Sequence, residues 1–277
     1  MTASELPSPA GARGQIATRN GVVRSWEPFA WGASTVVMLV LAWELLARVG
    51  IFPERFTSSP TRVVATGIAM LRSGELTHDT LVTLTEFGIG MAVAIGLGIP
   101  IGLAAGWYRR LQYALEPYLA ALYATPSLAL LPLLVLWFGI GLRSTIALVV
   151  ISAFFPLVIN VMYGVHTVDL ALLRMARSFR ANQLTVFRDI VLPGTIPFLA
   201  SGLQLGVARG LIGVIIGEMY SAYNGGLGYE IAVAGASVTI DRMFVAVATI
   251  TALGIVLMGS MAALERRLQH WKPKATE

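Results

Sequence analysis

Six long apolar runs constrain the fold of this chain more than any other feature of its sequence. The first covers residues 29–50, and a helix of that length reaches about 33 Å, which is enough to cross the hydrocarbon core of a bilayer. Five runs of similar length follow, at residues 81–107, 117–140, 145–165, 196–220 and 243–264. Lipid does not tolerate open strand edges, so each run is expected to be a helix. The sequence therefore predicts an all-α membrane protein with about six transmembrane helices.

Composition excludes several other classes of protein. Hydrophobic residues make up 56% of the chain and charged residues only 13%, about half the charge expected of a soluble protein. The chain has no cysteine, which rules out disulfides, thiolate metal sites and a cysteine nucleophile. Its net charge of +5 would suit nucleic acid, but the basic residues gather at the ends of the apolar runs. Its three histidines, His78, His166 and His270, lie in different loops, so neither a metal site nor a nucleophile–base pair is apparent. We therefore expect a membrane protein that binds no metal or nucleic acid and is not an enzyme.

The distribution of basic residues predicts the orientation of the chain. If both termini are cytoplasmic, 13 Lys and Arg residues fall inside and six outside, with Arg209 within a run. Residues 1–27 are rich in Ser, Pro, Gly and Ala, and we expect a mobile cytoplasmic tail there rather than a cleaved signal peptide. Residues 28–267 would form the transmembrane domain, and residues 268–277 a second cytoplasmic tail. This pattern indicates a multi-pass membrane protein with both termini in the cytoplasm.

Small residues and prolines mark two of the runs. Gly98, Gly102 and Gly106 repeat every four residues, which predicts a face where another helix approaches closely. Pro117, Pro126 and Pro132 interrupt the run 117–140, since each removes a helix hydrogen bond. Two interpretations of these prolines remain open, a simple packing kink and the lining of a transport path.

The segment 168–193 is too polar to cross a membrane. Asp169 is suited to cap a helix in which apolar residues recur at helical spacing. Arg174, Arg177 and Arg180 lie on another flank of that helix. A second short helix, 183–190, is expected to follow and to stop before Pro193. The pattern alone allows either a partner-binding helix or a helix lying on anionic lipid.

A set of residues along 35–271 matches one known pattern. Within segment 168–193 these residues are Asp169, Leu172, Leu173, Ala176, Arg177, Ser178, Ala181, Phe187, Leu192 and Pro193. Outside it they include Trp43, Glu44, Ser59, Pro60, Pro126, Trp137, Pro197, Glu218, Met219, Gly226, Gly228, Asp241, Glu265 and Trp271. The chain thereby resembles the permeases of binding-protein-dependent ABC transporters that carry the "EAA" loop. It is most similar to the branch for nitrate, sulfonate, taurine and bicarbonate.

The resemblance implies a permease of the bacterial inner membrane with the type I ABC importer (MetI-like) fold, in which segment 168–193, which we call the coupling segment, docks on a cytoplasmic ATPase. The residues predicted to make this contact are Asp169, Leu172, Leu173, Arg174, Ala176, Arg177, Ser178, Phe179 and Arg180. A second permease copy, a solute-binding protein and membrane lipid would be the other partners. A Walker loop ends in Lys, and the chain's only lysines are Lys272 and Lys274. We therefore expect this chain to bind no cofactor, with ATP and Mg²⁺ held by the partner ATPase.

Three positions depart from the family's pattern. Arg174 occupies the usual glutamate position, Met175 an alanine position and Arg180 the position of a turn glycine. Arginine resists the positive φ that glycine adopts, and the charge reversal at Arg174 should change the partner surface that the segment prefers.

Charged residues within the apolar runs need a partner, water or the protein interior. We predict that Arg209 and Glu218 line the translocation path together with Met219 and Trp137, and we call this the path prediction. The alternative for Glu218 is a helix cap, and Glu86 is expected to reach the outer interface by snorkelling.

Three functions stay under consideration. An ABC importer permease for a small anionic solute is favoured. An ATP-independent secondary carrier or channel would need inverted repeats or deep carboxylates, and no repeat is visible. A membrane scaffold would use the coupling segment only to bind lipid. The sequence leaves the solute open among nitrate, sulfonates, taurine, bicarbonate, a pyrimidine precursor and aromatic carboxylates.

Overall fold

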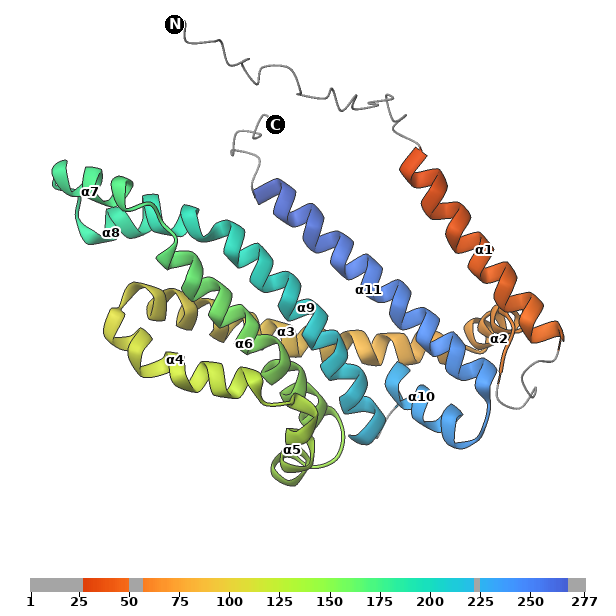
Figure 1. Cartoon of the computed structure of the whole chain (residues 1–277). Coiled ribbons are helices and arrows are strands. Elements are labelled where there is room, and N and C mark those ends of the chain that lie inside the picture. Colours follow the sequence, from red (N-terminus) through yellow and green to blue (C-terminus); the bar gives the residue numbers. More distant parts are fainter. Residues whose placement is uncertain (1–26, 50–56, 222–224, 269–277) are drawn as a thin grey trace, which may run out of the picture.

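A computed structural model describes residues 27–49, 57–221 and 225–268, and helices are the only regular elements in these ranges (Figure 1). The two predicted tails, 1–27 and 268–277, lie almost wholly outside the described residues. Five described helices are long and apolar enough to cross a membrane: α1 (Glu27–Val49), α3 (Glu75–Trp107), α6 (Leu142–His166), α9 (Leu192–Ser221) and α11 (Ile240–Leu268). The all-α membrane architecture is confirmed.

The third predicted span, 117–140, is wrong as a single helix. It is a pair of helical pieces, α4 (Arg109–Ala124) and the turn η1 (Ser127–Leu130) with α5 (Leu131–Phe138), which meet at 92°. The break falls at Thr125, whose backbone is extended, with φ −71° and ψ 127°. Pro126 explains this conformation, because a proline ring crowds the preceding residue out of the helical region. The number of spans is therefore five, or six if the bent pair counts as one.

Helix α6 lies at the centre and packs closely against α3 and α9. The glycine face predicted on α3 is confirmed: Gly98 faces Leu157 of α6, Gly102 faces Val161 and Gly106 faces Val165. On α9, the glycines that face α6 are Gly202, Gly206, Gly213 and Gly217. Small residues on both partners allow the backbones to approach, which is how helices associate where lipid offers no hydrophobic driving force.

Two short helices, α2 (Pro60–Ser73) and α10 (Leu227–Ala236), were not predicted. Ser59 starts α2 by accepting a hydrogen bond from the backbone N–H of Arg62. The preceding Ser58 ties three elements together, because its carbonyl accepts from Trp43 Nε1 at 2.8 Å and its hydroxyl donates to Asp241 at 2.6 Å. Glu44 of α1 likewise accepts hydrogen bonds from Thr61 and from Arg48. Several motif residues thus join α1, α2 and α11.

The coupling segment contains α7 (Leu170–Ser178), α8 (Gln183–Val186) and a π turn, η2 (Phe187–Val191). The expectation that a second short helix stops before Pro193 is wrong, since α8 and η2 continue into α9. In the π turn the N–H of Leu192 donates to the carbonyl of Phe187, five residues earlier. This shift of register lets the helix accommodate Pro193, which has no N–H and crowds the carbonyl four residues before it.

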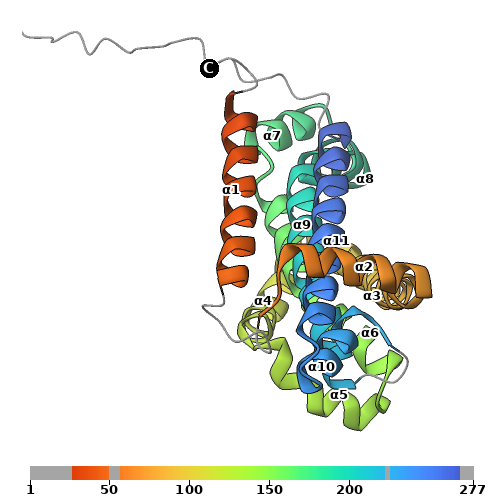
Figure 2. The same cartoon turned by 90° about the vertical axis from the view of Figure 1, so that its right-hand side faces the viewer.

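The helices give the molecule two distinct ends. Helices α7 and α8 lie at the end where α1 begins and α11 finishes, and we call this the α7 end (Figure 1). Helices α5 and α10 lie toward the opposite end, which we call the α10 end (Figure 1). Helix α1 stands beside the other helices as a separate rod (Figure 2), and its most apolar stretch has no buried residue.

Candidate functional site

Helix α7 is closed at both ends by defined caps. At its start the carboxylate of Asp169 accepts a hydrogen bond from the N–H of Ala171 at 2.7 Å, as the sequence predicts. At its end the N–H of Arg180 donates to the carbonyl of Arg177, and the N–H of Ala181 donates to the carbonyl of Ala176. This pair of bonds is a Schellman motif. Arg180 has the left-handed backbone that the motif requires, with φ 54°.

The apolar residues of α7 divide between two surroundings. Ala176 is buried, and Leu173 packs against the cluster of Val165, Val168 and Val191 beneath the helix. The apolar positions beside them point away from this cluster and are exposed: Leu172 by 44%, Met175 by 52% and Phe179 by 80%. One edge of the helix therefore anchors it to the membrane helices, while the other presents an apolar surface at the α7 end.

The positive flank of α7 is exposed as well. Arg174, Arg177 and Arg180 all have exposed side chains, and none forms an ion pair within the described part of the chain. Ser178 donates its hydroxyl hydrogen to the carbonyl of Arg174 at 3.1 Å, so it satisfies itself within the helix. The exposed side of α7 thus combines three cations with an aromatic ring.

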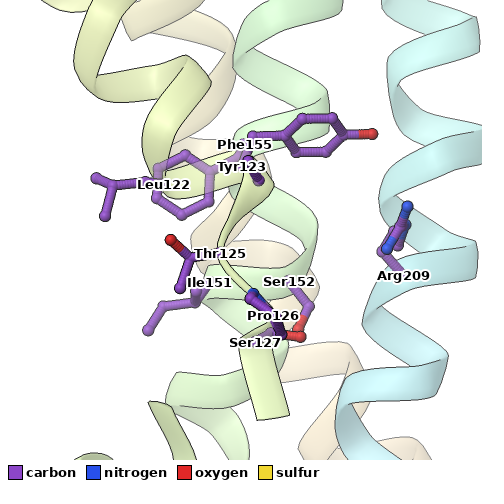
Figure 3. Close-up of a pocket in the computed structure, with 10 residues that line it drawn as sticks. Leu122, Tyr123, Thr125, Pro126, Ser127, Ile151, Ser152, Phe155 and Arg209 are labelled. Carbon is purple, nitrogen blue, oxygen red and sulfur yellow. The ribbon is translucent and has the colours of Figure 1, made fainter. Parts of the chain in front are cut away.

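A cavity of about 430 Å³ lies between α4, η1, α6 and α9 (Figure 3). Arg209 of α9 lines it, with the guanidinium carbon 5.9 Å from the centre of the Tyr123 ring. Ser152 of α6 lines it too, and its buried hydroxyl oxygen has no hydrogen-bond partner. The other lining residues are Leu122, Ala124, Thr125, Pro126, Ser127, Ile151 and Phe155. The break at Pro126 is thus one wall of the cavity.

The other residues of the path prediction lie elsewhere. Glu218 is 2% exposed, and its Oε2 accepts a hydrogen bond from the N–H of Gly228 at 2.7 Å, so its contacts are those of a helix cap. Met219 is 37% exposed on α9, and Trp137 is 65% exposed on α5. Of the four residues, only Arg209 lines the cavity of Figure 3.

Glu218 belongs to a group of side chains that caps α10. The N–H of Gly226 donates to Asp79, that of Leu227 to Thr83 and that of Gly228 to Glu218. These donors would otherwise be unsatisfied at a buried helix start. The expectation that Glu86 snorkels to the outer interface is wrong, since Glu86 is 6% exposed. Helices α9 and α10 both pack against α3, and the carboxyl group of Glu86 lies near that of Glu218.

Sequence reasoning missed Ser152 and Tyr123 as neighbours of Arg209. Ser152 is one of few polar residues in the apolar run 145–165, which was a usable signal. Tyr123 lies near the end of α4, and its contact with Arg209 depends on how α4 and α9 are placed in the folded molecule. Spacing along the chain carries no information about that placement.

Comparisons with known proteins agree with this architecture. Residues 98–270 match the family model described as "Binding-protein-dependent transport system inner membrane component". The riboflavin transport system permease protein RibX of Chloroflexus aurantiacus is 32% identical over 254 residues, covering 90% of this chain and 94% of that protein. The putative aliphatic sulfonates transport permease protein SsuC of Bacillus subtilis is 27% identical, covering 88% and 89%. The taurine transport system permease protein TauC of Escherichia coli is 29% identical, covering 86% and 88%.

Solved structures share the fold. A chain of the MetNI methionine ABC transporter in an inward-facing conformation aligns with a TM-score of 0.62 and 17% identity. The alignment covers 70% of this chain and 95% of that one. The family match, the fold and the membrane helices therefore agree: this chain belongs to the family of binding-protein-dependent transport system inner membrane components, as a permease subunit of an ABC importer with the MetI-like fold, and it is a transport component rather than an enzyme.

Proposed function

We propose that two copies of this permease form a translocation path for a small organic anion across the bacterial inner membrane. An ABC ATPase pair, which holds ATP and Mg²⁺, would dock on α7 and drive the cycle. The permease family itself implies an ATPase and a solute-binding protein as partners. The observation that carries the proposal is the capped helix α7, whose anchored edge and exposed Phe179 suit a mechanical link.

The link works because α7 is rigid at both ends and fixed to long helices. Leu173 packs against Val165 of α6 and Val191 of η2, which continues into α9, so a force on the exposed edge of α7 would tilt α6 and α9. The exposed Leu172, Met175 and Phe179 would fill a groove on the ATPase, and Arg174, Arg177 and Arg180 would meet acidic residues at its rim. This is the role that the sequence predicts for the coupling segment.

Orientation follows from the two ends of the molecule. The first residue of α1 and the last of α11 lie at the α7 end, so a cytoplasmic ATPase on α7 would put both helix ends on the cytoplasmic side (Figure 1). The excess of basic residues expected on that side supports this orientation. The solute-binding protein would then meet the α10 end.

A second copy would complete the path. Helix α5 buries Leu131 and Leu134 but leaves Leu136, Trp137 and Phe138 exposed by 79%, 65% and 49%. A two-fold partner packed on this exposed apolar surface would bury these side chains and complete the path. Helix α1, which has almost no buried surface, would face lipid.

An anionic solute is supported by two considerations. Relatives that match most of the chain are described as permeases for aliphatic sulfonates and for taurine, although others are described for riboflavin and formylaminopyrimidine. The cavity beside the broken helix contains a cation, Arg209, and none of its ten lining residues carries a carboxylate. An uncompensated cation within the membrane domain attracts anions and repels cations.

The test is uptake into proteoliposomes that contain the permease with its ATPase and binding protein. We expect ATP-dependent uptake of radiolabelled butanesulfonate or taurine, and no uptake when ATP is replaced by a non-hydrolysable analogue. Uptake without ATP would favour the secondary carrier and overturn the ABC mechanism. Uptake of neutral riboflavin with no uptake of sulfonates, taurine, nitrate, bicarbonate or aromatic carboxylates would overturn the anion assignment.

A further inference from the structure

We infer that the cavity of Figure 3 is a binding site within the membrane domain for an organic monoanion with a compact apolar tail, in which Arg209 and Ser152 hold the anionic head group. This inference rests on the proposed function, because it names the step at which the transported anion contacts the permease. It goes further by assigning the residues and the form of the solute.

Arg209 supplies the charge. Its side chain is exposed to the cavity and makes no ion pair within the described residues, so its guanidinium is free to receive an oxyanion. Its one aromatic contact is the Tyr123 ring, at 5.9 Å from the centre. A guanidinium presents parallel N–H donors that match the geometry of a sulfonate or carboxylate group. A single arginine without a second cation in the lining favours one negative charge.

Ser152 supplies an unused hydrogen-bond donor. Its oxygen is buried without a partner and faces Gly213 of α9, since a Cβ added at Gly213 would be 2.9 Å from it. Gly213 lies about one helical turn beyond Arg209. Most serines and threonines in apolar helices donate to a carbonyl of their own helix, as Ser201 and Thr249 do here. A buried polar group left without a partner reduces stability, so it calls for an explanation. A bound anion would provide the missing acceptor.

The remaining walls define the tail. Leu122, Ile151 and Phe155 are apolar, while the Tyr123 ring lies toward Arg209 (Figure 3). The volume of about 430 Å³ is in the range of small-molecule sites and suits a short alkyl or aryl group beside the head group. Ser127 and Thr125 stand at the broken helix, and Thr125 already donates to the carbonyl of Ala121. The site therefore pairs one polar side with one apolar side.

Chemical protection of Arg209 tests the site directly. Phenylglyoxal modifies accessible guanidinium groups, and mass spectrometry of the purified permease–ATPase complex reports the rate at each arginine. We expect saturating butanesulfonate to slow modification of Arg209 about tenfold, because a bound anion excludes the reagent. Arg143 is exposed and lies outside the cavity, so its rate should stay unchanged. Neutral butanol, used at the same concentration, should protect neither residue.

Two variants separate binding from structure. Ser152→Ala should weaken the protection of Arg209 by butanesulfonate about threefold or more, while raising the thermal unfolding temperature because the unpaired hydroxyl is removed. A purely structural serine would not change both quantities in this way. Arg209→Gln should lower butanesulfonate uptake about tenfold or more in proteoliposomes, while the binding protein still stimulates ATP hydrolysis.

The failures of the two proposals are distinguishable. If wild-type proteoliposomes take up butanesulfonate but the anion does not protect Arg209, or protects Arg143 equally, the inferred site is overturned and the anion importer stands. Equal uptake by wild type and Arg209→Gln would also overturn the site. If the wild type takes up only neutral solutes, the proposed function fails and the inferred site fails with it.

Discussion

At Arg180 the chain adopts a backbone conformation that usually belongs to glycine. The φ of 54° completes the Schellman motif at the end of α7, because the N–H groups of Arg180 and Ala181 must both turn back to the helix. The sequence leads us to expect that arginine resists a positive φ at this position. The backbone nevertheless forms the motif, so the strain of the left-handed conformation at Arg180 lowers the stability of the end of α7.

Arg180→Gly should therefore stabilise the end of α7 by about 1 kcal/mol, since glycine adopts the left-handed region without strain. Hydrogen exchange of the amides in residues 170–181, measured on the purified protein, would show slower exchange. Arg177→Gly is the matched control, because glycine inside the helix should lower stability by about 1 kcal/mol. Faster exchange in Arg180→Gly than in the wild type would refute the strain.

Thr83 tests the cap of α10. Its side chain is fully buried and its hydroxyl accepts the N–H of Leu227 at 3.0 Å. Thr83→Val keeps the shape but leaves that N–H unsatisfied, so we expect a loss of about 1–3 kcal/mol in the free energy of unfolding. Thr85→Val, two residues along α3, removes a hydroxyl that only donates to its own helix and should change stability by less than about 0.5 kcal/mol. Equal unfolding temperatures for the two variants would contradict the cap.

Individual residues could be predicted where one local rule decides their position. Asp169 was expected to cap a helix and does so, because a cap depends only on the next few residues. Glu86 was predicted wrongly and Ser152 was missed, because their surroundings depend on helices far away in the sequence. Charge and hydropathy along the chain do not show which side of a helix will be covered.

At the scale of elements, the glycine face of α3 sets how closely α6 approaches. A Cβ at Gly102 would lie 2.8 Å from Val161 Cβ and 2.9 Å from the carbonyl oxygen of Val158. Gly102→Ala should therefore destabilise the protein by about 1–3 kcal/mol, because backbone and β-branched atoms have little room to shift. At Gly96 nothing lies within 4 Å of the added atom, so Gly96→Ala should be neutral or stabilising. Thermal unfolding in detergent measures both, and similar losses would contradict the close packing.

Long elements were predictable and short ones were not. Apolar runs of about 20 residues gave the membrane helices, because bilayer thickness fixes their length. Helices α2 and α10 have only 14 and 10 residues, and contacts with side chains of other helices hold them in place. For example, Asp79 of α3 and Glu218 of α9 accept hydrogen bonds from the start of α10. Pro126 marked an interruption, but only the packing of α4 and α5 against α6 fixes its angle.

At the scale of the whole molecule, the coupling segment connects the α7 end to the centre. Phe179→Asp should lower ATP-driven uptake at least about tenfold without unfolding the membrane helices, because it places a charge on the exposed apolar edge. Leu173→Asp should also uncouple transport, but it would loosen the anchor of α7 as well, since Leu173 packs into the cluster below. Phe179→Leu is the matched control and should keep most uptake. Wild-type uptake by Phe179→Asp would refute this role.

Because the natural chain has no cysteine, a single introduced thiol reports directly on contact with the ATPase. We would measure the rate at which a water-soluble maleimide labels Phe179→Cys in the permease alone and in the complex with its ATPase. Arg72→Cys, on an exposed position of α2 away from the α7 end, is the control. If the ATPase drives transport through α7, labelling at position 179 slows about tenfold or more in the complex while labelling at position 72 does not change. Equal labelling at position 179 with and without the ATPase would contradict the coupling of transport to ATP hydrolysis through α7.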